Sequence, residues 1–158
     1  MLNPNPITDV IAATLTAIPQ LNAAMSVEGV CRINSYHYRM GVEVKLEEAI
    51  YKMPSPSMLV AFEKTHGGNF DGGTIFKHQW CVYFRMANMA GVQTPIGYED
   101  LWWIVCNENP TGSPVNIRYM QLYSGLDIMD TPSITHMVDQ EQIDIFRADF
   151  IFPEIGDQ

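Results

Sequence analysis

The stretch Thr74–Met86, TIFKHQWCVYFRM, decides the fold of this chain. Its side chains alternate between a mainly aromatic and apolar set and a more polar set. The first set comprises Phe76, His78, Trp80, Val82 and Phe84, and the second comprises Lys77, Gln79, Cys81, Tyr83 and Arg85. Because successive residues of a β-strand point to opposite faces, this alternation predicts a long strand with one face in a core.

The sequence upstream predicts a partner for this strand. Ser57–Glu63 is short and mostly apolar and follows Pro54 and Pro56, so we expect a second strand there. The intervening segment Gly67–Gly73, GGNFDGG, has the composition of a turn. Together the three segments predict an antiparallel hairpin with a glycine-rich tip.

Helical periodicity marks two other regions of the chain. Apolar residues recur at helical spacing over Ile7–Ile18, and Pro19 is expected to end that helix. Tyr98–Cys106 predicts a second helix with acidic residues in its first turn. Val44–Lys52 fits either a short helix or a strand running into a turn, and Gly29–Tyr36 alternates so weakly that it is interpreted as a link.

Two further strands are predicted in the C-terminal half, at Val115–Tyr123 and Ile143–Phe152. Both faces of Ile143–Phe152 are partly apolar, which suits a central strand of a covered sheet or a strand that carries a subunit contact. The predicted fold class is therefore α+β: an antiparallel β-sheet with an N-terminal helix and a second helix packed on one face. The length suits one domain, residues 1–158, in which 124–142 is a possible arm or extended loop.

The formal net charge of −9 is unevenly distributed. Residues 1–123 hold 10 acids and 8 bases, whereas residues 124–158 hold 8 acids and one base, Arg147. This acidity argues against a general nucleic-acid binder, which needs Lys and Arg to replace counterions on the phosphates. The C-terminal acids are interpreted either as a solvated face, or as a surface that repels a polyanion or docks on a basic partner.

The nucleophilic and metal-ligating residue types form no motif of known chemistry. The four histidines lack the spacings of zinc sites, and no G-x-S-x-G elbow is present. Cys81 follows His78 at an odd separation, which puts the two side chains on opposite faces of a strand. No catalytic residue, cofactor or metal is therefore predicted. A membrane partner is not expected either, because the chain has no run of about 18 apolar residues.

Surplus apolar surface is the suggestive feature of the composition. Trp102 and Trp103 are adjacent on an expected helix, about 100° apart, so they cannot both lie at the centre of one buried face. Methionines add adaptable apolar surface. The residues expected at a subunit interface are Trp102, Trp103, Met86, Met89, Phe150 and Phe152.

The order and texture of these elements resemble the tail-terminator and related neck proteins of tailed bacteriophages. The resemblance covers residues 5–152 and is carried by the helix Ile7–Ile18, the Pro-flanked apolar run Pro54–Phe62, the long strand Phe76–Met86, a helix and a closing strand pair. It implies a small α+β subunit without catalytic residues that forms a ring, typically a hexamer, on the end of the tail tube. Such a ring ends tube polymerisation and joins the tail to the head.

The same resemblance implies the partners and the location of the protein. The expected partners are further copies of the chain, the tail tube protein and the neck (head-tail connector) proteins. DNA is expected to pass through the lumen without specific binding, and an acidic lining would keep the phosphates from being gripped. The expected location is the virion neck, after synthesis in the host cytoplasm.

Two other classes of function remain open at this point. A small cone-shaped α+β enzyme or ligand-binding protein would place a pocket near His78, Trp80 and Tyr119, with Asp149 or Glu63 as a base. A monomeric adaptor or inhibitor would instead use the acidic end of the chain to bind a basic partner. Mass in solution discriminates, because a ring contradicts both alternatives.

Overall fold

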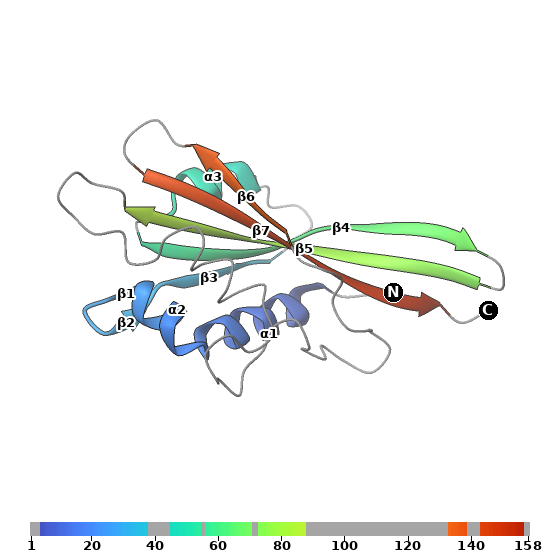
Figure 1. Ribbon diagram of the computed structural model, residues 1–158, viewed down its shortest axis with the longest axis horizontal. Coiled ribbons are helices and arrows are strands. Elements are labelled where there is room, and N and C mark those ends of the chain that lie inside the picture. Colours follow the sequence, from blue (N-terminus) through green and yellow to red (C-terminus); the bar gives the residue numbers. More distant parts are fainter. Residues whose placement is uncertain are drawn as a thin grey trace.

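A five-stranded sheet is the centre of the described part of the molecule (Figure 1). The computed structural model describes residues 4–37, 45–54, 56–70, 73–87, 133–138 and 143–156. Helices and strands combine there in an α+β fold, as predicted. In chain order the elements are α1 (Pro4–Thr16), α2 (Pro19–Ala24), β1 (Ser26–Val27), β2 (Val30–Cys31), β3 (Ile33–Tyr36), α3 (Leu46–Tyr51), β4 (Ser57–Phe70), β5 (Gly73–Ala87), β6 (Ser133–Val138) and β7 (Ile143–Gly156).

The strands of the sheet follow the order β3-β4-β5-β7-β6. All neighbours are antiparallel except β3 and β4, which are parallel over Ile33–Tyr36 and Met58–Ala61. A parallel pair needs a crossover connection, and α3 lies in that connection. The interpretation of Gly29–Tyr36 as a link is therefore wrong, because β3 is an edge strand of the sheet.

The hairpin β4–β5 is longer than predicted. β4 continues from the expected end at Glu63 to Phe70, so Gly67 and Gly68 are strand residues and not part of a turn. The chain reverses between Phe70 and Gly73, which pair with each other. Because β5 offers a ladder of hydrogen bonds along the whole segment, backbone pairing outweighs the poor strand propensity of glycine.

One face of the sheet, called here the α1 face, packs against α1 and α2. The alternation predicted for β5 holds, since Trp80, Val82 and Phe84 are buried on this face. The helix supplies Ile7, Ile11 and Leu15 to the same core, as its apolar periodicity predicts. From β7, the core receives Phe146, Ala148, Phe150 and Phe152.

The opposite face, called here the α3 face, has a smaller core. Ile50 and Met53, from α3 and the turn after it, pack there on Leu59, Tyr83 and Ile145. Figure 1 shows α1 on one side of the sheet and α3 on the other. A helix therefore covers each face of the sheet, whereas the sequence placed helices on one face.

The N-terminal region contains two elements that the sequence reading missed. α1 ends at Thr16, before Pro19, but Pro19 then opens α2, where its fixed φ and missing N–H suit the first turn of a helix. β1 and β2 form a small hairpin through Glu28 and Gly29, whose φ angles of 52° and 82° are both positive. Positive φ at both central residues is typical of a tight two-residue hairpin turn.

Several expected elements lie outside the described residues. They are the helix at 98–106, the strand at 115–123 and most of the 124–142 segment. Within that segment, β6 (Ser133–Val138) is a strand of the sheet, paired with β7. In the described ranges no helix is both long and apolar enough to span a bilayer.

Candidate functional site

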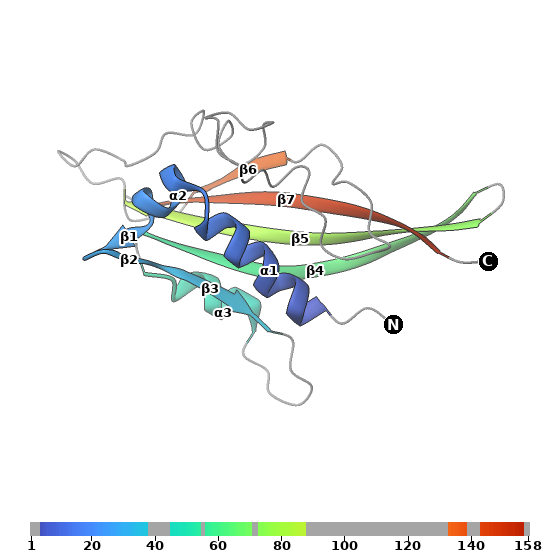
Figure 2. The same cartoon turned by 90° about the horizontal axis from the view of Figure 1, so that it is seen from below.

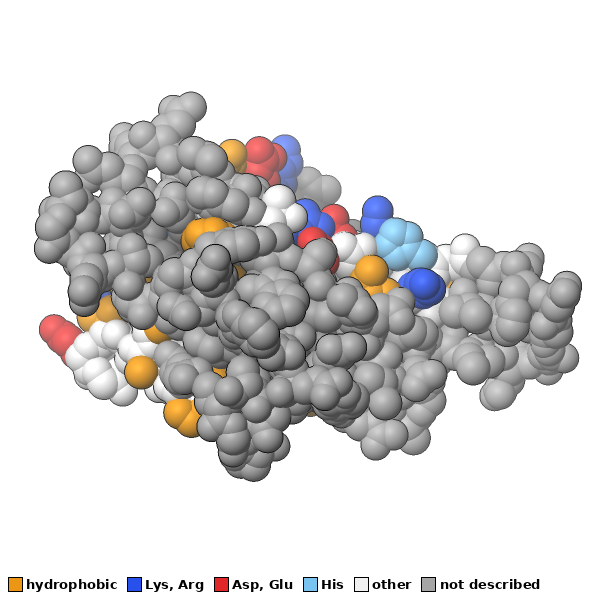
Figure 3. All heavy atoms as spheres, in the orientation of Figure 1, with side chains coloured by type: hydrophobic (Ala, Val, Ile, Leu, Met, Phe, Trp, Pro, Cys, Tyr) orange, Lys and Arg blue, Asp and Glu red, His pale blue; other side chains and the backbone are white. Residues whose placement is uncertain are grey.

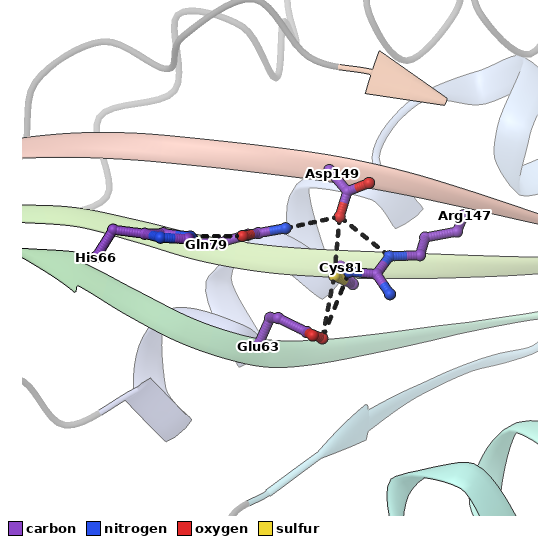
Figure 4. Close-up of polar contacts among 6 residues, drawn as sticks. All are labelled: Glu63, His66, Gln79, Cys81, Arg147 and Asp149. Carbon is purple, nitrogen blue, oxygen red and sulfur yellow. Dashed lines mark hydrogen bonds and ion pairs between the residues drawn. The ribbon is translucent and has the colours of Figure 1, made fainter. Parts of the chain in front are cut away.

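Polar side chains gather on the α3 face, beyond the area that α3 covers. Figure 3 shows charged and histidine side chains of the described residues in a band that runs from α3 toward the outer part of the sheet. Four of them, with a glutamine and a cysteine beside them, contact one another across β4, β5 and β7, and the six side chains are called here the polar cluster (Figure 4). Its members are Glu63, His66, Gln79, Cys81, Arg147 and Asp149.

A β-bulge in β4 brings His66 onto this face, on which Glu63 already lies. Phe62 pairs with Trp80 and Lys64 pairs with Gln79, so Glu63 is an extra residue without a pairing partner in β5. A one-residue shift of register reverses the face of every later side chain. His66 therefore lies on the same face as Gln79, whereas an unbroken alternation from Phe62 would have put it on the α1 face.

Asp149 is the acceptor at the centre of the polar cluster. Its Oδ1 accepts hydrogen bonds from Gln79 Nε2 at 2.9 Å, from Cys81 Sγ at 3.1 Å and from Arg147 Nε at 3.1 Å. The Asp149 side chain is only 17% exposed, so these donors replace most of the water that the carboxylate would otherwise bind. The carboxylate is thus held in one orientation by three donors from two strands.

Glu63 and His66 extend the polar cluster in two directions. Glu63 Oε2 lies 3.6 Å from a terminal nitrogen of Arg147 and accepts from Cys81 Sγ at 3.5 Å. On the other side, His66 Nε2 lies 2.9 Å from Gln79 Oε1. Because Gln79 gives its NH₂ group to Asp149, its amide oxygen faces His66, and His66 Nε2 must carry the proton.

Cys81 serves the polar cluster as a donor and not as a nucleophile. Burial, the largest cause, raises the pKa of the Cys81 thiol far above its usual value, and the hydrogen bond to Asp149 raises it further. The thiolate is the reactive form of cysteine, so a thiol held protonated is inert. His78 does not assist it, because His78 lies on the α1 face beside Trp80, as the odd separation predicts.

Tyr83 and Arg147 close the cluster on the side of α3. The guanidinium of Arg147 lies 5.8 Å from the centre of the Tyr83 ring, within the range of a cation–π contact. Burial works to lower the pKa of Arg147, but the neighbouring Cys81, Tyr83 and Asp149 raise it above its ordinary value. Burial also raises the pKa of Tyr83, to about 12. At neutral pH the charged guanidinium of Arg147 therefore lies beside the neutral thiol of Cys81 and, outside the polar cluster, the neutral phenol of Tyr83.

The geometry of the polar cluster suits the joining of strands better than chemistry on a substrate. Its donors and acceptors satisfy each other across three strands, and they do not converge on a point where a reacting atom would sit. Within the described ranges, no group of three or more His, Cys, Asp or Glu side chains is placed to hold a metal ion. We therefore interpret the cluster as a cross-strand network that fixes β4, β5 and β7 where they leave the helical core.

The structure does not bring the residues of the alternative pocket together. His78 and Trp80 are buried on the α1 face, whereas Glu63 and Asp149 lie on the α3 face. A sheet separates the two pairs, so neither carboxylate reaches the aromatic pair as a base. Tyr119, the remaining residue of that pocket, lies outside the described residues.

The expected interface residues are only partly described. Phe150 and Phe152 are fully buried in the core under α1, so their side chains leave no surface for a partner, and the prediction for these two is corrected. β7 lies between β5 and β6 over Asp144–Asp149, so it is a central strand there, and a subunit contact through β7 stays a prediction. Met86 belongs to β5, and the residues outside the described ranges are Met89, Trp102 and Trp103.

The signal that would have found the polar cluster is weak in the sequence. Arg147 and Asp149 share one face of β7 by simple alternation, and Gln79 and Cys81 share one face of β5 in the same way. The register that brings these pairs together, and the bulge that adds His66, have no local signature. Comparison of the chain with protein-family models and with curated proteins gave no match.

Proposed function

We propose that this protein is a structural subunit of the neck of a tailed phage. In this proposal, copies of the chain form a ring, a hexamer, that ends the tail tube and joins the tail to the head. DNA passes through the ring without being bound. The proposal assigns no catalytic role to the chain.

The observation that carries the proposal is the extension of the sheet beyond its helices. β4, β5 and β7 have 14, 15 and 14 residues, where strands of about 5–6 residues are usual. Their outer parts run past α1 and α3 as a three-stranded blade (Figure 2). We call this blade the sheet extension: Lys64–Phe70, Gly73–Gln79 and Ile151–Gly156.

A sheet extension of this kind favours an assembly role on energetic grounds. Lys64, Thr65, His66, Phe76 and Lys77 are exposed there, whereas His78 and Phe152, at the inner end of the blade, are still buried on the α1 face. Isolated strands without a covered apolar face are marginally stable in water. Contact with neighbouring copies would supply the missing burial, and the polar cluster fixes the blade at its root. Charge supports the second half of the proposal, because a net charge of −9 does not favour contact with phosphates.

A tube-capping assay tests the proposed function. Tail tube protein would be polymerised alone and in the presence of the purified chain, and the ends of the tubes would be examined by electron microscopy. We expect shorter tubes that carry a ring on one end, with heat-unfolded protein as the control that leaves the tubes unchanged. Tubes of unaltered length with bare ends would contradict the proposal.

A further inference from the structure

The sheet extension has two strand edges that no described strand covers. β3 pairs with β4 only as far as Ala61, and β6 pairs with β7 only as far as Asp149. Beyond these residues β4 and β7 have β5 on one side and no described strand on the other. An uncovered edge presents a row of backbone N–H and C=O groups that can pair with another chain.

We propose that these edges pair between copies of the chain, the β4 edge of one copy with the β7 edge of the next. The proposal rests on the ring assembly of the proposed function and names the contact that would hold it together. The two edges lie on opposite sides of the same blade and differ in sequence, so the contact is heterologous. Each added copy leaves one β4 edge and one β7 edge free, and only a closed ring pairs them all.

Gly67 in the β4 edge supports a close approach of another backbone. Its φ is not in the left-handed region, and a Cβ built on it would lie 3.8 Å from the Phe76 ring, an ordinary contact. The fold of the subunit therefore does not need glycine here, although glycine in a strand is destabilising relative to alanine. Glycine in a strand is typical of a site where a second backbone comes close.

Features at both edges limit the pairing to a defined register. The bulge at Glu63 and the charged side chain of Lys64 stand at the inner end of the β4 edge. On the β7 edge, Pro153 has no N–H to donate. Bulges, Lys and Pro are the devices by which edge strands avoid indiscriminate pairing. They direct a partner toward one alignment and disfavour random aggregation.

Thiol cross-linking tests the edge pairing. Lys64 and Ile151 both pair with Gln79, from opposite sides, so they lie in one row on the same face of the sheet. Lys64→Cys and Ile151→Cys would each be made with Cys31→Ser and Cys106→Ser, which leaves the buried Cys81 as the native thiol. Circular dichroism checks that each variant folds. A flexible bis-maleimide would tolerate a small offset in register.

We expect a cross-linked dimer when the two single variants are mixed, and none from either variant alone. A product from one single variant alone would overturn the proposal, because it indicates a two-fold contact between like edges. Oligomers by light scattering without any cross-link would overturn the edge pairing and leave the ring intact. A monomer under every condition would overturn both.

Discussion

Trp80 Nε1 donates a hydrogen bond of 3.1 Å to Thr8 Oγ1, and both side chains are fully buried. The bond joins α1 to β5, the central strand of the sheet, although the two residues are 72 positions apart in the sequence. Trp80 also has Phe62 at 5.1 Å and Phe152 at 5.8 Å, both in edge-to-face geometry. The Thr8 hydroxyl thus satisfies the indole N–H in a largely apolar part of the core.

Removal of that hydroxyl should be costly. Thr8→Val keeps the shape of the side chain but leaves the indole N–H buried without this acceptor, so we expect a loss of about 1–3 kcal/mol in the free energy of unfolding. Thr8→Ser keeps the acceptor and is the matched control, with a smaller loss. Urea unfolding followed by tryptophan fluorescence measures both. An equal loss in the two variants would show that packing, and not the hydrogen bond, fixes the contact.

Tyr83 is expected to contribute to the free energy of unfolding at neutral pH and to lose that contribution at alkaline pH. Its pKa is about 12 in the folded chain, against about 10 when unfolded. Between these values the unfolded chain has released the phenolic proton and the folded chain has kept it, so raising the pH favours unfolding. The contribution is therefore complete below pH 10 and disappears as the pH rises toward 12.

The matched variant for this prediction is Tyr83→Phe. It lacks the phenol and should lose less stability than the wild type between pH 10 and pH 12, while the two proteins behave alike at pH 8. Unfolding free energies measured along the pH series give the difference directly. Parallel curves for the two proteins would contradict the pKa shift.

Cys81 is predicted to be unreactive in the folded protein. Iodoacetamide at pH 8, followed by peptide mass mapping, should leave Cys81 unmodified in native protein and modify it fully in denaturant. Because burial is the largest cause of its raised pKa, Asp149→Asn should leave the thiol unreactive as well. Native alkylation of Cys81 as fast as in denaturant would mean that the α3 face opens readily.

Duplex DNA should pass this protein without being retained. The region 124–158 holds 8 acids and one base, and that base, Arg147, is paired with Asp149 and Glu63. This region therefore offers almost no Lys or Arg that could neutralise phosphates and release their counterions. A gel-shift assay at low salt should show no retardation of DNA, and a salt-sensitive shift would contradict the account of the lumen.

Alternation in the sequence was enough to assign the faces of the two strands that matter most. Trp80 and Cys81 fall on opposite faces of β5 as predicted, and Phe146 and Arg147 divide in the same way in β7. These assignments succeed because each strand is long and one of its faces is buried under α1. A strong period of two is then imposed on the sequence.

The remaining elements form because they pair with strands that are distant in the sequence, and a local sequence pattern does not reveal such pairing. β3 has only four residues, and its pairing with β4 crosses the connection through α3. Gly67 and Gly68 have the composition of a turn, but the ladder with β5 keeps them in a strand. The bulge at Glu63 decides that His66 joins the polar cluster, and it arises from the register of two strands and not from a residue type.

The mass of the protein in solution tests the central claim, ring assembly, most directly. Size-exclusion chromatography with light scattering would be run over a range of protein concentrations, with and without tail tube protein. Ring assembly predicts a discrete species whose mass is the multiple of 17.9 kDa that corresponds to a closed ring. A single species of 17.9 kDa at every concentration, and no association with the tube protein, would contradict it.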